Sequence, residues 1–386
     1  MKKIYIISFL FINLLIYSQK VTITAIGDIM AHDNLQEYAL ANEAGYFVLF
    51  EKTKSIFLKD DLTIGNLETP VCDTIPIKGF PQFNAKTSLV TAIKNAGVDV
   101  VSLANNHSYD QRDIGVTSTI EAVKKEGLIY SGTGFTPEIA RKPVIFSKNG
   151  VIFGFFSATF SINGINIIEE EDKPYVNLVP MENEKRLENF CKIIAETKKT
   201  VDFMIVAYHC GTEYTNTPIE IQEKALKKIA ESGADLVLAH HPHVLEKIEY
   251  FKTLDKRNVL IAYSLGNFIS AQARYLPKLK NNNQIYDSVL SKTAEGIILQ
   301  LDVVKWDNNL NIVNPRIIPI FNISFRTEQN KKMYQGFQTT LIEDILKDDF
   351  TDSRFESNIP DIKKLVTYRF EKIKKLIDLP VVYENK

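Results

Sequence analysis

The chain has 386 residues and a mass of 43.9 kDa. Its 46 Lys and Arg residues nearly balance its 47 Asp and Glu residues, which leaves a formal net charge of -1 at pH 7. With 45% hydrophobic and 24% charged residues, the composition is that of a globular protein with a substantial core, which excludes disulfide-dense miniproteins and low-complexity chains. The lack of a basic excess argues against a general nucleic-acid binder.

The first residues have the pattern of a secretory signal peptide. Lys2 and Lys3 form a positive start, residues 4–16 are almost wholly apolar, and Ser18 is a small residue suited to cleavage. The apolar stretch is short for a transmembrane helix. We therefore predict a signal peptide over 1–18, with an uncleaved anchor as the alternative. The protein is expected to be exported and periplasmic or extracellular, with membrane association left open.

Strands and helices alternate along most of the chain. The predicted strands are 21–26, 62–64, 98–104, 144–146, 151–156, 203–206, 236–238, 259–264, 297–304 and 312–318, and the predicted helices are 47–58, 88–96, 114–126, 182–199 and 218–232. Gly97, Gly127 and Gly233 mark three helix ends. Asn149-Gly150 predicts a hairpin turn. This alternation predicts an α/β layered fold, and the hairpin makes the sheets mixed.

The C-terminal part is predicted to be helical. Residues 329–347 and 361–377 have the spacing of two amphipathic helices. The second helix has a Lys-rich face, which is expected to be solvated, with contact to an anionic surface as the alternative. We predict one main domain over 21–325 and a C-terminal helical extension over 326–386.

The three cysteines, Cys72, Cys191 and Cys210, match no zinc-site spacing. An odd number implies no disulfide framework, although one disulfide stays open in an oxidising compartment. Three small buried side chains are expected instead.

Polar residues gather just after the predicted strands, where α/β sheets place their active sites. Asp28 follows the first strand and Glu68 the second. The six histidines are His32, His107, His209, His240, His241 and His243, and all except His32 come directly after an apolar strand. Carboxylates, imidazoles and amide oxygens together predict a centre for one or two divalent cations, with manganese, iron and zinc left open. Two such cations exceed the charge of two carboxylates, so the centre would attract a phosphate or another anion and activate water.

Six short motifs occur in a fixed order between about residues 22 and 270. They are Gly27-Asp28-Ile29-Met30, Asn66-Leu67-Glu68-Thr69-Pro70, Ser102-Leu103-Ala104-Asn105-Asn106-His107, His209-Cys210-Gly211-Thr212-Glu213-Tyr214, His240-His241-Pro242-His243-Val244 and Tyr263-Ser264-Leu265-Gly266-Asn267-Phe268. Together they resemble the bacterial capsule-synthesis family called CapA, which is linked to poly-γ-glutamate. That family resembles calcineurin-like metallophosphoesterases, which implies a four-layer α/β/β/α sandwich with mixed sheets.

The resemblance also implies a role for each matching residue. Six residues would bind cations: Asp28 and His243 the first, Glu68 both, and Asn106, His209 and His241 the second. His107 would be the acid beside the leaving group. Asn105, Glu213, His240 and Asn267 would support the site or contact the substrate.

The chain departs from the pattern at two positions. The superfamily usually has His two residues after the first Asp, where this chain has Met30. The first cation would then have fewer ligands, which leaves a single cation or a substitution by His32 as alternatives. Cys210 stands where the family often has Trp, and its thiol is expected to point away from the site.

The resemblance implies a secreted protein of capsule or exopolymer synthesis that acts as a metal-dependent hydrolase of phosphoester or other anionic cell-envelope substrates. The alternative is a non-catalytic assembly factor that holds an anionic polymer in the same pocket. The Asn106-His107 pair favours catalysis, whereas Met30 favours the alternative. The expected partners are the polymer or phosphoester and capsule-synthesis membrane proteins, with no nucleic acid.

Overall fold

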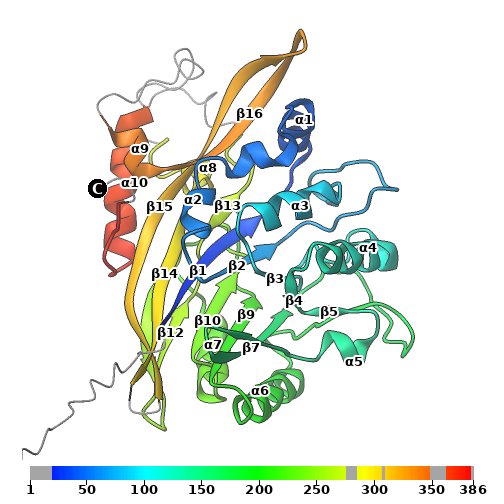
Figure 1. Ribbon diagram of the computed structural model, residues 1–386, viewed down its shortest axis with the longest axis vertical. Coiled ribbons are helices and arrows are strands. Elements are labelled where there is room, and N and C mark those ends of the chain that lie inside the picture. The colour runs from blue at the N-terminus through cyan, green and yellow to red at the C-terminus, as the bar shows by residue number, and fades with distance from the viewer. Residues whose placement is uncertain (1–19, 275–284, 307–308, 348–361, 384–386) are drawn as a thin grey trace, which may run out of the picture.

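The computed structural model describes residues 20–274, 285–306, 309–347 and 362–383. Two large mixed sheets lie face to face, and helices cover their outer faces (Figure 1). The predicted α/β/β/α sandwich with mixed sheets is therefore confirmed. The predicted signal peptide, 1–18, lies outside the described residues.

The first sheet joins the N-terminal part of the chain to its C-terminal part. In spatial order it contains β16 (Lys332–Leu341), β15 (Asn309–Gln329), β14 (Glu295–Trp306), β1 (Lys20–Ile29), β2 (Leu62–Leu67), β3 (Val100–Ser102) and β4 (Ile129–Ser131), and β13 (Asn267–Ile269) also pairs with β1. The strands from β1 to β4 run parallel, whereas the pairs β1–β14, β14–β15 and β15–β16 are antiparallel.

The second sheet comes from the middle of the chain. In spatial order it contains β11 (Ile248–Lys252), β12 (Asn258–Ala262), β10 (Leu236–His240), β9 (Phe203–His209), β7 (Val151–Thr159) and β6 (Val144–Lys148). Its four inner strands run parallel, and the two edge strands are antiparallel to them. The predicted hairpin is confirmed, because β6 and β7 turn at Asn149 and Gly150, both with positive φ. A small separate sheet pairs β5 (Thr133–Gly134) with β8 (Tyr175–Val176).

Helices surround the sheets. They are α1 (Asp33–Ala41), the 3-10 helix η1 (Gly45–Phe50), α2 (Lys54–Phe57), α3 (Ser88–Asn95), α4 (Arg112–Lys125), α5 (Pro137–Ala140), α6 (Glu184–Lys198), α7 (Glu220–Glu231), α8 (Val289–Ala294), α9 (Ile342–Leu346) and α10 (Ile362–Leu376). The helices predicted over 88–96, 114–126, 182–199 and 218–232 are confirmed within a few residues at their ends. The stretch 47–58 is divided between η1 and α2 instead of forming one helix.

The strand β9 shows how the sequence assigns the two faces of a sheet. Successive side chains of a strand point to opposite faces. Phe203 and Ile205 enter the core between the two sheets, whereas Val206 and Tyr208 enter the outer core with residues of α6 and α7. Because both faces are covered, β9 is apolar until its last residue, His209. A polar residue at that position therefore marks the end of the strand.

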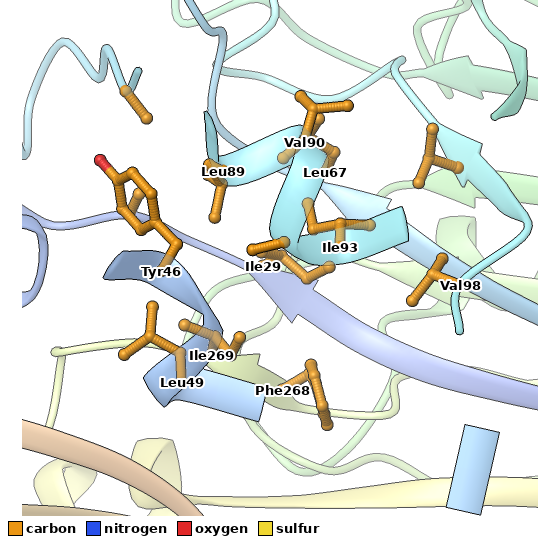
Figure 2. Close-up of a cluster of buried hydrophobic side chains, with 14 of the residues drawn as sticks. Ile29, Tyr46, Leu49, Leu67, Leu89, Val90, Ile93, Val98, Phe268 and Ile269 are labelled. Carbon is orange, nitrogen blue, oxygen red and sulfur yellow. The ribbon is translucent and has the colours of Figure 1, made fainter. Parts of the chain in front are cut away.

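A second outer core fixes the ends of β1 and β2. Figure 2 shows Leu89 and Ile93 of α3 packed beside Ile29 of β1 and Leu67 of β2, with Phe268 nearby. Burying each side chain of this size contributes about 1.5–3 kcal/mol relative to leaving it exposed. This packing holds the two strand ends from which the site residues project.

The helix predicted over 329–347 is wrong. Residues Lys332–Leu341 form the strand β16, and only Ile342–Leu346 are helical. Asn330 and Lys331 both have positive φ, 51° and 63°, which is the backbone of a tight hairpin turn. The apolar residues of this segment have helical spacing, but β16 pairs with β15 along its whole length, and this pairing makes the segment a strand.

The C-terminal helix predicted over 361–377 is confirmed as α10. The domain boundary predicted between 325 and 326 falls inside β15, which runs on to Gln329. Among the described residues, no helix combines the length and the apolar character needed to cross a membrane. The cysteines Cys72, Cys191 and Cys210 are all buried and free, as expected.

The carboxyl ends of the parallel strands of both sheets lie at one edge of the sandwich. Asp28 pairs in register with Asn66, and His209 pairs with His240. A Cβ atom on Gly27 would lie 1.9 Å from the carbonyl oxygen of Gly266, so only glycine allows this approach. The Asp28 amide donates to the same oxygen at 3.1 Å. The position of Asp28 is thus fixed on both sides by backbone contacts.

Candidate metal centre

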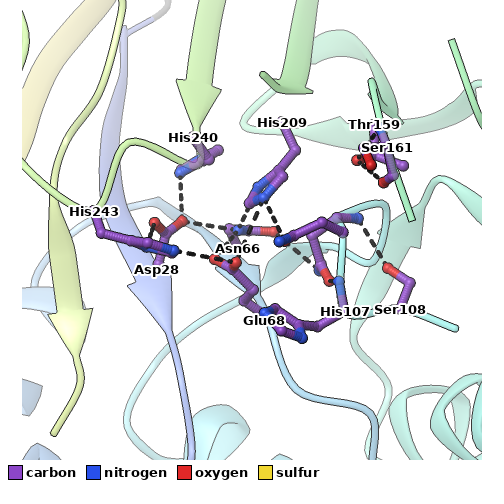
Figure 3. Close-up of polar contacts among 12 residues, drawn as sticks. Asp28, Asn66, Glu68, His107, Ser108, Thr159, Ser161, His209, His240 and His243 are labelled. Atoms are coloured by element: carbon purple, nitrogen blue, oxygen red, sulfur yellow. Dashed lines mark hydrogen bonds and ion pairs between the residues drawn. The ribbon is translucent and has the colours of Figure 1, made fainter. Parts of the chain in front are cut away.

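Nine polar residues converge at this edge of the sandwich, and none is more than 6% exposed. They are Asp28 on β1, Asn66 on β2, Glu68 just after β2, Asn106 and His107 after β3, His209 at the end of β9, His240 at the end of β10, and His241 and His243 in the loop that follows. Figure 3 shows Asp28, Asn66, Glu68, His209, His240 and His243 directed toward one another from the ends of several strands and the loops that follow them. Buried charges of this kind require partners or a bound ion.

Two groups of ligand atoms overlap at one carboxylate. Oxygen and nitrogen atoms of Asp28, Glu68 and His209 lie within 4.8 Å of one another, and so do those of Glu68, His241 and His243. Glu68 belongs to both groups, which is the position expected of a bridging ligand. The grouping differs from the family-based expectation, which places His209 with His241 on one cation.

Direct contacts complete the cluster. His243 Nδ1 lies 3.0 Å from Asp28 Oδ2, so these two proposed ligands of the first cation are adjacent. His209 Nε2 lies 2.9 Å from Asn106 Oδ1, which joins two proposed ligands of the second cation. The structure therefore brings together all six residues expected to bind cations.

Asn66 lies at the centre of the cluster, although the sequence assigned it no role. Its Nδ2 lies 2.8 Å from Asp28 Oδ1, 3.3 Å from Glu68 Oε2 and 3.3 Å from His209 Nδ1. One amide thus orients two carboxylates and one imidazole. Its position two residues before Glu68, which places both on the same side of an extended strand, is a signal that sequence reasoning could have used.

The two carboxylates have opposite shifts in pKa. Burial disfavours the charged form of Asp28, but the hydrogen bonds and charges of His240 and His243 outweigh burial and hold its pKa well below the usual range. Burial raises the pKa of Glu68 well above its ordinary value, and the negative charge of Asp28 adds to this effect. When no cation is bound, Glu68 therefore keeps its proton to a higher pH than an ordinary glutamate does.

Two imidazoles of the cluster, those of His209 and His241, are held in the neutral form that binds metals. Burial lowers the pKa of His209 well below its ordinary value, and burial with the charge of His243 lowers the pKa of His241 to about 3. Glu68 Oε1 and His241 Nδ1 are buried and have no hydrogen-bond partner among the described residues. Two carboxylates, an amide oxygen and neutral imidazoles with unpartnered atoms fit one or two divalent cations of the manganese, iron or zinc type.

The loop that carries His241 and His243 has an unusual backbone. Both residues have positive φ, 107° and 57°, which costs on the order of 1–3 kcal/mol for each non-glycine residue. Two contacts hold this loop: Tyr214 N donates to Pro242 O at 2.8 Å, and Asn267 Nδ2 donates to His243 O at 3.2 Å. Asn267, a candidate supporting residue, therefore contacts the ligand loop directly.

His107 lies beside the cluster and forms a pair with Asp110. Its Nδ1 lies 2.8 Å from Asp110 Oδ2, and its ring packs edge-on against Phe83 with the ring centroids 4.6 Å apart. Phe83 N donates to the same carboxylate oxygen of Asp110 at 2.7 Å. Sequence reasoning missed Asp110, although a spacing of three residues in one turn could have indicated the pair.

Asn105 supports the site from behind. Its Nδ2 donates to Leu67 O at 2.8 Å, and its Oδ1 accepts from the His107 amide at 3.2 Å. It thereby ties the loop after β3 to the end of β2. His240 reaches the cluster itself, with Nδ1 3.3 Å from Asp28 Oδ1.

Three other candidates lie outside the ligand groups. Glu213 is partly exposed, and its charge contributes to the raised pKa of Glu68. His32 belongs to neither group of clustered ligand atoms, and its Nδ1 accepts from Ala271 N at 3.3 Å. Cys210 packs in the outer core of the second sheet, which confirms that it points away from the site.

Comparison with known proteins supports a common ancestry. The model of the family described as "Bacterial capsule synthesis protein PGA_cap" matches residues 22–272. "Capsule biosynthesis protein CapA" of Bacillus anthracis is 31% identical over 261 residues, which is 66% of this chain and 61% of that protein. "PGA biosynthesis protein CapA" of Bacillus subtilis is 29% identical over 345 residues, which is 88% of this chain and 80% of that protein.

Solved structures show only a distant likeness. The NAD nucleotidase of Haemophilus influenzae aligns with a TM-score of 0.46 and 12% identity, covering 92% of this chain and 61% of that one. The calcineurin-like phosphoesterase YfkN of Bacillus subtilis aligns with a TM-score of 0.42 and 14% identity, covering 93% and 97%. A likeness of this degree does not extend to a shared substrate or reaction. The family match, by contrast, includes every residue of the cation-ligand cluster, and the chain belongs to the bacterial capsule synthesis protein family PGA_cap.

Proposed function

We propose that this protein is a metal-dependent hydrolase of phosphoester or related anionic cell-envelope substrates, with a part in the synthesis of a capsule or exopolymer of the poly-γ-glutamate type. The observation that carries the proposal is the His107–Asp110 pair beside a buried set of cation ligands. A site built only to hold an anion needs the positive charge, but it has no need of an imidazole fixed by a carboxylate.

The cation ligands in this proposal are Asp28, Glu68, Asn106, His209, His241 and His243. Bound divalent cations supply positive charge that attracts a phosphoryl group and stabilises the charge that develops on its oxygens. Asn66 holds the carboxylates of Asp28 and Glu68 and the ring of His209 in position for this task.

His107 is the proposed general acid. The contact of its Nδ1 with Asp110 leaves Nε2 as the ring nitrogen that exchanges a proton with the substrate. The Asp110 carboxylate orients the ring through this contact. The proton on Nε2 then passes to the leaving-group oxygen as the phosphoester bond breaks.

The place of this activity is proposed from the sequence and from the relatives. The N-terminal pattern over 1–18 supports export, with the protein working outside the cytoplasmic membrane. Two relatives are named for capsule and PGA biosynthesis, which supports an anionic envelope polymer or its phosphoester precursor as the substrate class. Capsule-synthesis membrane proteins are the proposed partners.

Hydrolysis of model phosphoesters tests the proposal. Purified protein with Mn²⁺ should hydrolyse a chromogenic phosphodiester or monoester, and EDTA should abolish the activity. His107→Ala should retain Mn²⁺ by calorimetry but lose about 10²–10⁴-fold in turnover, as expected for a missing general acid. A wild-type protein that binds Mn²⁺ and poly-γ-glutamate yet hydrolyses nothing faster than His107→Ala would instead be an assembly factor.

A further inference from the structure

One exposed residue outside the family-derived site reaches back into it. Asn163 lies in the loop that follows β7, at a turn where it and Gly164 have φ of 52° and 69°. Ile162, the residue before it, is buried in the outer core of the first sheet. The backbone N–H of Asn163 donates to Ser161 Oγ at 3.2 Å. The loop is therefore anchored by the two residues before the turn, and Asn163 projects from this base.

The side chain of Asn163 contacts both members of the Asn106-His107 pair. Its Oδ1 accepts a hydrogen bond from Asn106 Nδ2 at 3.1 Å, and its Nδ2 lies 3.3 Å from His107 Nδ1. Asn163 comes from the second sheet, whereas the pair follows β3 of the first sheet. The contact thus joins the loop after β7 of the second sheet to the loop after β3 of the first sheet.

These contacts decide which way the Asn106 amide faces. An asparagine amide has an acceptor at one end and donors at the other, so engaging its nitrogen fixes the direction of its oxygen. With Nδ2 engaged by Asn163, Asn106 directs Oδ1 toward His209 Nε2 at 2.9 Å. Only the oxygen of an amide binds a cation, and the reverse orientation would present the NH₂ group to it.

We propose that Asn163 is a positioning residue that holds the Asn106 amide oxygen toward the cation site shared with His209. This inference rests on the proposed cation centre and adds to it a residue that binds no cation itself. Partners of this kind typically change metal affinity by 10- to 100-fold when they are removed.

Two substitutions separate the amide contact from the backbone. Asn163→Gly keeps the positive φ and removes the side chain, whereas Asn163→Asp keeps an oxygen that accepts from Asn106 Nδ2 and tolerates the same backbone. Asn149→Gly is the matched control. Asn149 also has a positive φ, 49°, and is exposed, but its side chain donates to Asp61 and does not reach the site.

Isothermal titration of the metal-free full-length protein with Mn²⁺ gives the readout. Asn163→Gly should weaken one Mn²⁺ binding step by roughly 10- to 100-fold. Asn163→Asp and Asn149→Gly should bind at least as tightly as wild type, and all three should unfold in EDTA within a few degrees of wild type. Wild-type affinity in Asn163→Gly would overturn this inference alone. No Mn²⁺ binding by the wild-type protein would overturn both this inference and the proposed function.

Discussion

The ion pair between Arg369 and Glu295 and the ligand cluster around Glu68 are both deeply buried, but their polar atoms are differently satisfied. Arg369 makes two contacts with the Glu295 carboxylate, at 2.8 and 2.6 Å, and a third with Asp287 at 2.9 Å. In the cluster, Glu68 Oε1 has no hydrogen-bond partner among the described residues, and His241 Nδ1 has none either.

The difference separates a structural contact from a binding site. A paired and hydrogen-bonded charge is complete in the folded chain alone, and it fastens α10 to the start of β14. Unpartnered buried atoms cost free energy, and a bound ion is one way in which a native fold offsets that cost. The comparison predicts that substitutions at the two places affect stability in different ways.

Breaking the ion pair should give the largest loss of stability. Arg369→Ala leaves the Glu295 carboxylate buried without its partner, which typically costs about 3–5 kcal/mol. Urea unfolding monitored by circular dichroism measures this loss. Lys375→Ala, on the exposed face of the same helix, should change the unfolding free energy by less than about 0.5 kcal/mol. Equal losses in the two variants would show that the ion pair is unimportant.

Completing the cluster should stabilise the protein. A cation that binds only the folded state adds about 2.7 kcal/mol when its concentration is one hundred times the dissociation constant. Mn²⁺ should therefore raise the unfolding temperature of the metal-free protein in calorimetry. His209→Ala removes an atom of the ligand group and should abolish most of this increase. An unchanged increase in His209→Ala would remove His209 from the ligand set.

The smallest expected effect is on how the stability of the metal-free protein changes with pH. Burial and Asp28 raise the pKa of Glu68 in the folded state, so its proton stabilises the fold below about pH 4.3, the ordinary pKa of glutamate. This contribution is lost as the pH rises through the folded-state pKa. Glu68→Gln should therefore be more stable than wild type in EDTA at pH 8, with a smaller difference at pH 5.

The variant must be compared with wild type at each pH, because Glu246 also changes the stability of the protein with pH. Burial raises its pKa to about 8, so it weakens the fold with rising pH in wild type and variant alike. The difference between Glu68→Gln and wild type isolates Glu68. Parallel stability curves over this pH range would contradict the raised pKa of Glu68. The same variant should bind Mn²⁺ poorly, so that the gain in stability accompanies a loss of the ligand.

The alternation of strands and helices and the residues that converge in the cluster could be predicted from the sequence. Parallel strands covered on both faces must be apolar, so a polar residue such as His209 or Asp28 reveals where each strand stops and where the site begins. Adjacent strands place those ends together. The resemblance to the capsule-synthesis family then gave the same residues independently, and the family assignment is confirmed.

Other parts depend on contacts that a local pattern does not contain. Asp110 and Asn163 acquire their significance from contacts with His107, and the second of these crosses from one sheet to the other. The segment that forms β16 has helical spacing, but pairing with β15 makes it a strand. For Asn163 and β16, a contact with another part of the fold overrides the local signal, whereas the Asp110 contact lies within one turn of His107.

The close approach of Gly27 to Gly266 bears on the order in which parts of the chain fold together. Gly266, whose carbonyl holds Asp28 in place, follows every proposed cation ligand in the sequence. A chain that ends before Gly266 therefore contains all the proposed ligands but lacks the backbone that aligns Asp28. Contacts between segments so far apart in sequence form late because a long loop must close first. The proposed cation centre is thus complete only in the finished fold, in which Gly266 has reached Asp28.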